Sequence, residues 1–510
     1  MNKYIITVLA FLVVAISVSC SSASRRQPKP DDSLSTPPIV ERPSSQIVEH
    51  PSLLTFDSLD WKIPLGDQYR TTLANGAIAY VAVDSLLPLI NIEAYIRSGS
   101  LTNPIGREGI GSLLARLLRS GGTAQYPAAV LDSIIDLYAM RFSFSQAETH
   151  IKFNASFLSE FADTAMNIMD QMFFSPVFQE ERIERERSIM IENIRHRFAN
   201  PAPALSAAYR KHQYPQTAAS RLMTAASLES ITRGDLTALH ENAFGANGMI
   251  LAVSGKFCRD EMLAKLNNIF AKPPSTLAAQ FPEIAIAPET RALVVHHPSN
   301  QAHIRMGVPL FKRPHDDYYA VMVMNYILGG SGFTSRLGTR IRSDEGLTYS
   351  IRSTAESNYT YDGTMFIGFF TRIELYPKAI SIILEEIDKL ITDGITESEL
   401  EHARSALISE LPSSFRSPED IVSTYAWSEF FGREPDHYVK YPDELMKLTT
   451  EDLKNAAWKY INIDKITYTI VGDTTAINAA NVAAAADGFF TIDALNSKRV
   501  VVADSIVSLP

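Results

Sequence analysis

The clearest hydrophobic pattern in the chain lies in residues 108–123. Its large apolar side chains recur at helical spacing and fall on one face: Ile110, Leu113, Leu114, Leu117 and Leu118. A polar turn precedes this stretch, and Gly121 and Gly122 follow it as a helix stop signal. The pattern therefore predicts an amphipathic helix that packs its apolar face against a core.

Alternating apolar and polar positions predict strands around this helix. Residues 71–84 and 87–100 are bounded by turn residues and predict a pair of strands, and residues 142–153 predict one further strand. The remaining patterns predict helices at 128–138, 160–172, 185–197 and 318–328, and strands at 290–297 and 303–308. This mixture of separate strands and helices predicts an α+β fold.

An internal repeat with an offset of 217 residues joins the two halves of the sequence. The first copy starts at Thr232-x-x-Asp235 and ends in an apolar strand at Gly255, and the second starts at Thr449-x-x-Asp452 and ends at Gly472. Thr-x-x-Asp resembles a capping box, which begins a helix. Two copies of one α+β unit, each of roughly 200 residues, account for most of the 510 residues.

The amino-terminal residues have the pattern of an export signal. Lys3 precedes an apolar run that is short for a membrane-spanning helix, and the run ends at Ser19-Cys20. Cys20 predicts lipidation at a bacterial lipoprotein cleavage site; the alternative is an ordinary secretory signal that is cut nearby. We therefore expect a lipoprotein of the bacterial cell envelope that faces the periplasm, on either the inner or the outer membrane.

Composition divides the rest of the chain. We expect a signal peptide at 1–20, a Ser/Pro-rich tether at 21–55, a first domain at 56–275, a second domain at 290–475 and a carboxyl-terminal extension at 476–510. The overall composition is 46% hydrophobic and 20% charged, which is typical of globular proteins. A net charge of −10 argues against a nucleic-acid partner.

The helix at 108–123 resembles the zinc-binding helix of the insulinase/pitrilysin family of metallopeptidases. That family carries His-x-x-Glu-His in a frame of glycines, the inverted zincin motif. The frame is present here with Gly122 as one extra residue, but Ser112, Ala115 and Arg116 stand at the two His positions and the Glu between them. These residues can neither chelate zinc nor deprotonate a metal-bound water.

The resemblance also places the third zinc ligand, a Glu about 77 residues after the second His. Asn193 stands there, and Glu186 matches an acidic position in the second coordination shell. Glu192 is adjacent, but neighbours on a helix point about 100° apart, so it is a poor substitute. We therefore expect no catalytic metal in this chain.

The second half keeps a different motif of the same family. Gly329, Gly330 and Gly332 form a glycine-rich loop, and the R-x-x-x-G-L-x-Y-S pattern follows with Arg342 and Tyr349. The loop lacks the G-K-[ST] of a phosphate loop. In the family, this Arg and Tyr reach the substrate backbone near the scissile bond, which suits a guanidinium fork and a phenol. The alternative is a surface Arg and a packed Tyr.

The resemblance implies two homologous α/β sandwich domains that form a half-chamber like that of mitochondrial processing peptidase. In the short-chain branch, two polypeptides associate. One subunit carries Zn2+, and the other supplies the Arg and Tyr. We therefore expect a non-catalytic, substrate-clamping subunit of a heterodimeric zinc endopeptidase that acts on unfolded peptides, inactive alone and active only with a zinc-bearing partner. The alternatives are an inactive peptide-binding or scaffold protein, a homodimer, and a peptidase with displaced ligands.

Other candidate residues carry weaker signals. His402 lies near Glu399 on a predicted helix without a second imidazole, and His296 and His297 would face opposite sides of a strand. Cys258 has no neighbouring base and is expected to be an ordinary thiol. The strand at 142–153 corresponds to the edge strand that accepts peptides in the family, so we expect it to bind peptide or to line the chamber.

Overall fold

Two six-stranded sheets organise the chain. In this computed structural model, which describes residues 61–74, 76–244, 248–270, 280–288, 290–495 and 500–506, the strand orders are β1-β2-β6-β3-β5-β4 and β12-β7-β11-β8-β10-β9. The first sheet consists of β1 (Arg70–Thr72), β2 (Ile78–Val83), β3 (Leu89–Ile96), β4 (Arg141–Gln146), β5 (Ile151–Leu158) and β6 (Ile250–Gly255). The second consists of β7 (Ala292–His296), β8 (Gln301–Pro309), β9 (Ile351–Glu356), β10 (Thr364–Arg372), β11 (Thr467–Gly472) and β12 (Val500–Ala503).

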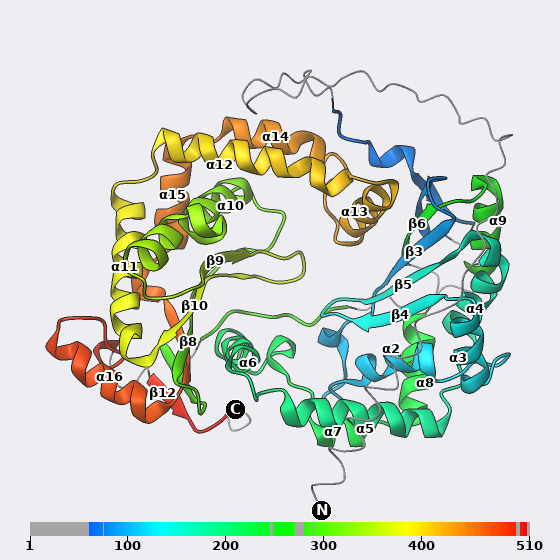
Figure 1. The fold of residues 1–510 in the computed structure, drawn as a ribbon, viewed down its shortest axis with the longest axis horizontal. Helices are drawn as coiled ribbons and strands as arrows, with labels where there is room; N and C mark the ends of the chain where they lie inside the picture. The colour runs from blue at the N-terminus through cyan, green and yellow to red at the C-terminus, as the bar shows by residue number, and fades with distance from the viewer. Residues whose placement is uncertain are drawn as a thin grey trace, which may run out of the picture. The chain divides into compact units, whose positions relative to one another are not determined.

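Each sheet has helices on one face and its own hydrophobic core beneath them (Figure 1). Over the first sheet lie α2 (Ile110–Ser120), α3 (Ala128–Leu137), α4 (Ala162–Phe174), α5 (Glu180–His196), α7 (Ala225–Glu229), α8 (Arg233–Ala243) and α9 (Arg259–Phe270). Over the second lie α10 (Tyr318–Asn325), α11 (Tyr376–Thr392), α12 (Glu397–Glu410), α14 (His437–Lys447), α15 (Thr450–Tyr460) and α16 (Thr474–Ala486). This is the expected α+β fold with two domains of one type.

Short helical turns complete the described chain. Two of them are π-helical, η6 (Tyr326–Gly330) and η8 (Gly338–Asp344). The others are η2 (Gly66–Gln68), η3 (Ser100–Thr102), η4 (Ser159–Phe161), η5 (Ala218–Ser220), η7 (Gly332–Thr334), η9 (Ile373–Leu375), η10 (Leu411–Phe415), η11 (Ile463–Lys465) and η12 (Asp493–Leu495). The helix predicted at 318–328 thus changes its winding at Tyr326.

The two domains exchange one helix each. α6 (Pro201–Gln213) follows the helices of the first domain, but its small apolar residues pack on the second sheet together with Leu293, Val295 and Val471. α13 (Pro418–Phe430) packs in the same way on the first sheet, where Glu429 accepts hydrogen bonds from Arg70 and Tyr80. Both helices cover the sheet face opposite the main core, so each sheet is buried on both sides near its centre.

Atomic contacts confirm the internal repeat. Thr232 with Asp235, and Thr449 with Asp452, form complete capping boxes at the starts of α8 and α15. Arg187 donates to the carbonyls of Leu228 and Ile231, and Arg404, 217 residues later, donates to those of Leu445 and Leu448, which are shifted by the same offset. The repeat therefore extends from the caps to the arginine that holds the preceding turn.

Two strand predictions need correction. β2 and β3 do not pair with each other, because the fully buried β6 lies between them, parallel to β2 and antiparallel to β3. The strand predicted at 142–153 is a hairpin of β4 and β5 with a turn at 147–150. A strand from further along the chain can insert between two strands that follow each other in the sequence, and periodicity alone does not reveal this.

The carboxyl-terminal tail joins the second domain. α16 contributes Ile477 and Ala480 to the second core, and β12 pairs in parallel with β7. Cys20 and the segment 1–55 lie outside the described residues. Within the part that the structure describes, no helix is both long enough and apolar enough to span a membrane.

Candidate functional site

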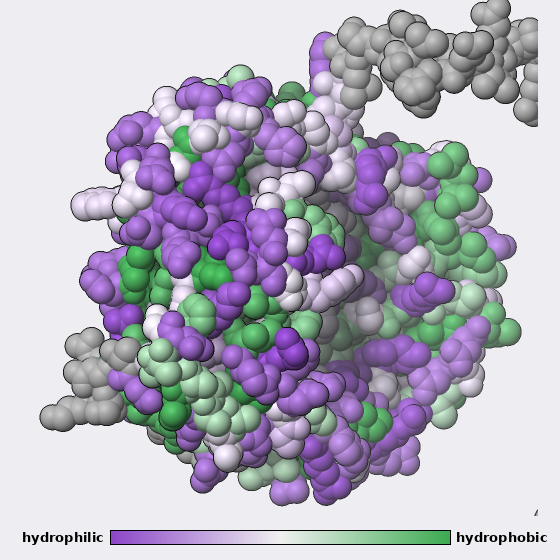
Figure 2. Space-filling view, turned by 60° about the vertical axis from the view of Figure 1, so that its left-hand side comes forward, coloured by the Kyte–Doolittle hydropathy of each residue, from purple (hydrophilic) through white to green (hydrophobic). Residues whose placement is uncertain are grey.

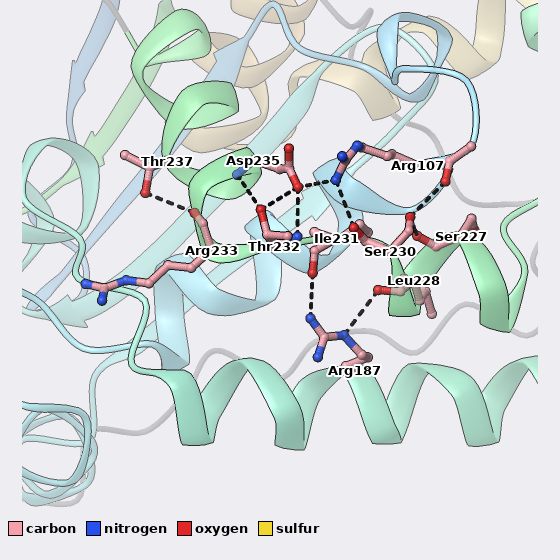
Figure 3. A network of polar contacts seen from close by, with 11 residues as sticks. Arg107, Arg187, Ser227, Leu228, Ser230, Ile231, Thr232, Arg233, Asp235 and Thr237 are labelled. Atoms are coloured by element: carbon pink, nitrogen blue, oxygen red, sulfur yellow. Dashed lines mark hydrogen bonds and ion pairs between the residues drawn. The ribbon is translucent and has the colours of Figure 1, made fainter.

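The helix that matches the zinc-binding motif is α2, and a polar network holds its start (Figure 3). Arg107, just before α2, forms an ion pair with Asp235 and donates to the carbonyl of Ser230 at 2.9 Å. Ser230 in turn donates to the carbonyl of Gly106 at 3.0 Å, and Ser227 donates to that of Glu108 at 2.8 Å. The approach to α2 is therefore tied to the turn between α7 and α8.

Arg187 on α5 completes this network from below in Figure 3. Its guanidinium donates to Leu228 at 3.1 Å and to Ile231 at 2.7 Å, and only 12% of its side chain is exposed. Hydrogen bonds from a charged donor are stronger than those from a neutral one, so they stabilise this turn. The network thus fixes the turn that holds α2 relative to α5, the two helices that carry the ligand positions.

Ser112, at the first ligand position, belongs to a short chain of hydrogen bonds. Its hydroxyl donates to Gln146 Oε1 at 3.2 Å, and Gln146 Nε2 donates to Asn103 Oδ1 at 3.1 Å. The Gln146 amide lies so close to α2 that a Cβ on Gly111 would come within 1.9 Å of its nitrogen. Ser112 is therefore held by an amide at the end of β4, and no base activates it.

An ion pair stands at the second ligand position. Arg116 Nη1 lies 3.2 Å from the Oε2 of Glu186 on α5, the carboxylate at the second-shell position. Asn193 is exposed, and Glu192 forms ion pairs with Arg195 and His196 at the surface. The guanidinium thus takes the acidic partner that α5 offers and brings a positive charge to a cation site.

These residues do not fit a zinc ion. Ala115 has no donor atom, Arg116 is a fixed cation, and Asn193 supplies only a neutral amide. Within the described ranges, no group of three or more His, Cys, Asp or Glu side chains could hold a metal ion. The donor chemistry at these positions therefore does not fit the zinc centre of the metallopeptidase motif.

A polar pocket of about 340 Å³ lies beside Ser112. Its charged groups are matched: Arg210 pairs with Glu148, and Arg221 donates to the carbonyl of Asn103 at 2.8 Å. Tyr361 donates to Glu148 at 2.7 Å, and burial together with that carboxylate raises the pKa of Tyr361, so the phenol stays a donor. The pocket is lined by residues around α2 and β4, by Arg210 of α6 and by residues between α6 and α7.

In the second domain, Arg342 lies between two aromatic rings. Its guanidinium carbon is 3.9 Å from the ring centre of Phe333 and 4.8 Å from that of Tyr349. Phe333 and Tyr349 are 67% and 75% exposed. Among the described residues, none accepts a hydrogen bond from Arg342 or forms an ion pair with it. The donors of this guanidinium are thus available, while both rings lie against it.

The glycine-rich loop joins η6 to η7 beside this stack. A Cβ on Gly329 would lie 2.6 Å from the Ser353 backbone nitrogen, so the loop packs directly on β9 at that point. At Gly330 a Cβ would lie 3.0 Å from Asn325, whereas Gly332 has a φ of +68° and open space around it. Glycine is thus needed for close packing at Gly329 and for a left-handed turn at Gly332.

The remaining candidates stay apart from both sites. His296 hydrogen-bonds Thr474 and His297 hydrogen-bonds the carbonyl of Phe198, so the two imidazoles have different partners. Cys258 is an exposed free thiol. β4 is an edge strand of the first sheet, the position from which a strand could be added. His402 lines a pocket in the second domain together with Glu399.

Three residues of these sites were not identified from the sequence. Asn103 and Gln146 give no sequence signal, because their link to Ser112 depends on how β4 meets α2. Phe333 does give one, since a large aromatic residue in the glycine-rich stretch GGSGF has no core to enter. The exposed Phe333 ring against Arg342 extends the Arg–Tyr pair to three residues.

Comparison with known proteins agrees with this architecture. The profile described as "Insulinase (Peptidase family M16)" matches residues 88–223, and "Peptidase M16 inactive domain" matches residues 230–407. The non-peptidase homolog YmxG of Helicobacter pylori is 22% identical over 392 residues, which cover 76% of this chain and 90% of that protein.

Solved structures show the same fold. A peptidase M16 inactive domain from Pseudomonas fluorescens matches with a TM-score of 0.72 and 23% identity, over 79% of this chain and 98% of that one. The periplasmic protease PqqL from Escherichia coli matches with a TM-score of 0.67 and 16% identity, over 79% of this chain and 45% of that one. The chain belongs to the insulinase (M16) peptidase family, as a member without the residues that bind zinc in that family.

Proposed function

We propose that this chain is the non-catalytic, substrate-clamping subunit of a heterodimeric insulinase-family zinc endopeptidase that acts on unfolded peptides. It supplies Arg342 and Tyr349 to a zinc site on its partner. The observation that carries the proposal is the contrast between the two sites. Arg116 and Glu186 pair at the ligand positions, whereas Arg342 has no acidic partner among the described residues and lies between exposed rings.

The chemistry of the Arg342 site supports a role at a peptide backbone. A guanidinium offers several N–H donors in one plane, and a phenol offers one more, so both can donate to a peptide carbonyl or to a developing oxyanion. Cation–π contacts with two aromatic rings help to hold the guanidinium in place without using its donors. Preorganised donors of this kind act with little reorganisation when the ligand arrives.

We place this subunit at the bacterial envelope. Cys20 would carry a lipid, the tether at 21–55 would separate the folded part from the membrane, and the periplasmic protease PqqL has the same fold. Metabolic labelling of the chain with a fatty acid, compared with a Cys20→Ser variant, tests this point. Label that persists in the variant would contradict lipidation at Cys20.

The experiment for the function uses the full chain purified gently from its native membrane. Zinc is counted and hydrolysis of a quenched peptide is measured on this sample and on the chain produced alone. We expect the native sample to cut the peptide with a copurified zinc-bearing subunit, and the lone chain to hold no zinc and to cut nothing. Hydrolysis by the lone chain would overturn the proposal and would revive a peptidase with displaced ligands.

Arg342→Ala tests the clamping role in the same complex. Loss of one donor to a developing oxyanion lowers kcat by about 100- to 1000-fold. The zinc content of the complex should not change. The control is Arg372→Ala, which removes an exposed arginine at the end of β10. Equal activity of the Arg342→Ala and control complexes would contradict the role.

A second candidate function is peptide binding or scaffolding without catalysis. The observation that favours it is β4, an edge strand of the first sheet next to the polar pocket at Ser112. Peptides bind such edges by adding a strand, which needs neither zinc nor Arg342. A native sample that binds unfolded peptide, cuts nothing and is indifferent to Arg342→Ala would favour this function.

A further inference from the structure

The second domain contains a pocket of about 590 Å³ that the function proposed above does not use. It lies between the two π-helical turns η6 and η8 on one side and the helices α11 and α12 on the other. π-helical turns within helices are frequent at functional sites. The volume is in the range of small-ligand pockets.

The internal repeat explains why this pocket is open. In the first domain α2 packs on α5, and in the second domain η6 packs on α12, the counterpart of α5. Arg116 and Glu186 pair across the first of these contacts. The residue 217 positions after Glu186 is Ala403, which lines the pocket. A short side chain thus stands where the first domain has a carboxylate, and the space between the elements remains free.

The cations of the pocket already have acidic partners. Arg336 donates to both oxygens of Glu399, at 2.6 and 2.8 Å. Burial alone would raise the pKa of Glu399, but the hydrogen bonds from Arg336 and Thr396 outweigh it and lower the pKa to about 2. Arg340 pairs with Glu345, and Lys389 lies 2.7 Å from Glu386. No cation in this pocket is therefore left to attract an anionic ligand.

Two carboxylates of the pocket differ in this respect. Asp344 and Asp393 line it, and within the described residues neither forms an ion pair. Asp393 accepts a hydrogen bond from the hydroxyl of its neighbour Thr392 at 3.2 Å. Tyr326, Ile327 and Ile395 line the same pocket and supply an aromatic ring and apolar surface. The pocket thus has negative charge without a cationic partner at Asp344 and Asp393. It also has apolar surface on which a hydrocarbon stem could lie.

We propose that this pocket binds an organic cation, an ammonium or guanidinium group on an aliphatic stem. The charged group would pair with Asp344 and Asp393, and the stem would lie on Tyr326 and Ile327, as lysine stems lie on apolar surface. Figure 2, which turns the left-hand side of Figure 1 forward, shows hydrophilic and hydrophobic residues interspersed on that side of the molecule. The proposal does not depend on a zinc-bearing partner.

A ligand in this pocket would also affect Arg342, because the pocket wall and Arg342 share the turn η8. Asp344 and Arg342 both belong to η8, and Tyr326 begins the η6 turn that leads into the glycine-rich loop. A cation that pairs with Asp344 would therefore stabilise the segment that presents Arg342. The ligand chemistry could come from a free polyamine or from a basic side chain of a peptide.

Isothermal titration calorimetry on the full chain tests the proposal with two probes, spermidine and a lysine-containing tripeptide with blocked termini. We expect saturable binding of at least one probe, weakened about tenfold or more in Asp344→Asn with Asp393→Asn, since each lost charged contact is a large share of such an affinity. Tighter binding of spermidine would identify a free polyamine as the ligand, and tighter binding of the tripeptide would identify a peptide side chain.

Two further variants keep this test specific. Asp388→Asn removes an exposed acidic side chain of α11 that lines a different pocket, so it should leave the affinity unchanged. Thr339→Lys puts an ammonium group at an exposed position of the pocket wall and should abolish binding, with the unfolding midpoint retained. An equal loss of affinity in Asp388→Asn, or no saturable binding of either probe, would overturn the proposal.

Discussion

The helix pair α2–α5 and the segment from η6 to η8 keep different parts of the family pattern. α2 is a regular helix whose start is fixed by Arg107, Arg187 and the α8 cap, yet its ligand positions hold Ser112, Ala115 and Arg116. The later segment is irregular, with two π-helical turns and a glycine-rich loop, yet it presents Arg342 and Tyr349 as the family pattern requires.

This difference shows that scaffold and chemistry are separable. The contacts that fix the start of α2 involve main-chain carbonyls, caps and a largely buried arginine, and none of them involves a ligand position. Replacing the ligands therefore costs the first domain little of its structure. At Arg342 the scaffold is weaker, because the side chain is held by two exposed rings, so packing alone does not account for its placement, whereas the substrate contact proposed above would.

The largest expected effect comes from restoring the ligands. A variant with Ser112→His, Ala115→Glu, Arg116→His and Asn193→Glu should bind zinc, because the frame of α2 and α5 is intact and three donors of the right type would converge. We expect about one zinc per chain, against none in the natural sequence, since zinc affinities of about 10 kcal/mol are reached by such sets. Zinc is counted by atomic absorption after dialysis.

The control for this variant omits Asn193→Glu and so lacks the third ligand. It should bind zinc far more weakly. If the complete variant is folded and still holds no zinc, the α2–α5 geometry has changed along with the residues, and the separation of scaffold from chemistry is wrong for this domain.

The next largest effect is expected from the two arginines that the repeat relates, Arg187 and Arg404. Arg187→Ala and Arg404→Ala each remove a guanidinium that is 12% or 13% exposed; Arg187 donates to two carbonyls and Arg404 to three. We expect each to lower the free energy of unfolding by about 2–3 kcal/mol, because hydrogen bonds from a charged donor are lost. Urea unfolding measures this. Arg195→Ala, at a 70% exposed position, should change it by less than about 0.5 kcal/mol.

The sequence predicted the repeat and the motifs better than the pairing of strands. Thr-x-x-Asp and the apolar strand ends are local signals, so the caps at Thr232 and Thr449 and the closing strands were found at their positions. β6 inserts between β2 and β3 from 154 residues beyond β3, and this depends on the whole sheet. The exchange of α6 and α13 is not predictable for the same reason, since amphipathic spacing does not say which sheet a helix covers.

Site contacts follow the same rule. Ser112, Arg116 and Asn193 were located by motif spacing, whereas Gln146 reaches Ser112 only because the end of β4 lies on α2. The η6 turn was missed because its first residues continue the apolar pattern of α10. Local patterns thus indicate which residues matter, and tertiary packing decides what they touch.

Two glycines test how tightly each site is built. Gly329→Ala puts a Cβ 2.6 Å from the backbone of Ser353, which cannot move freely, so we expect a loss of about 1–3 kcal/mol. Gly111→Ala meets only the flexible amide of Gln146. The displaced amide would lose its hydrogen bonds with Ser112 and Asn103, about 1 kcal/mol each, and the better helix propensity of alanine offsets about 1 kcal/mol, so we expect a net loss of at most about 1 kcal/mol. Urea midpoints compare the two, and a larger loss for Gly111→Ala would contradict this.

Acid titration separates a half-buried histidine from a half-buried carboxylate. Burial, with the nearby Lys152, lowers the pKa of His150 to about 4 from 6.5, so the stability contributed by its neutral form is present above 6.5 and is lost as pH falls through 4. His150→Phe should therefore reduce the slope of unfolding free energy in this range by up to about 1.4 kcal/mol per pH unit.

Glu399 should act at lower pH. Its pKa of about 2 lies below the usual 4.5, so its contribution is present above 4.5 and is lost as pH falls through 2. Glu399→Gln should flatten the curve only there. Urea titrations at a series of pH values measure both slopes. An unchanged slope between 6.5 and 4 in His150→Phe would show that the pKa of this ring is not lowered in the folded state.

The smallest expected effect concerns Phe333, and it rests on the proposed clamp. The ring covers one face of the Arg342 guanidinium at 3.9 Å but carries no donor, so it acts by positioning. An exposed cation–π contact contributes about 0.5–1 kcal/mol, which predicts a two- to fivefold rise in KM for peptide hydrolysis by the complex in Phe333→Ala, with kcat less affected. Phe333→Tyr keeps the ring and should restore KM. If Phe333→Ala and Arg342→Ala lower kcat equally, Phe333 touches the substrate itself, and the stack is part of the binding surface rather than a support for the guanidinium.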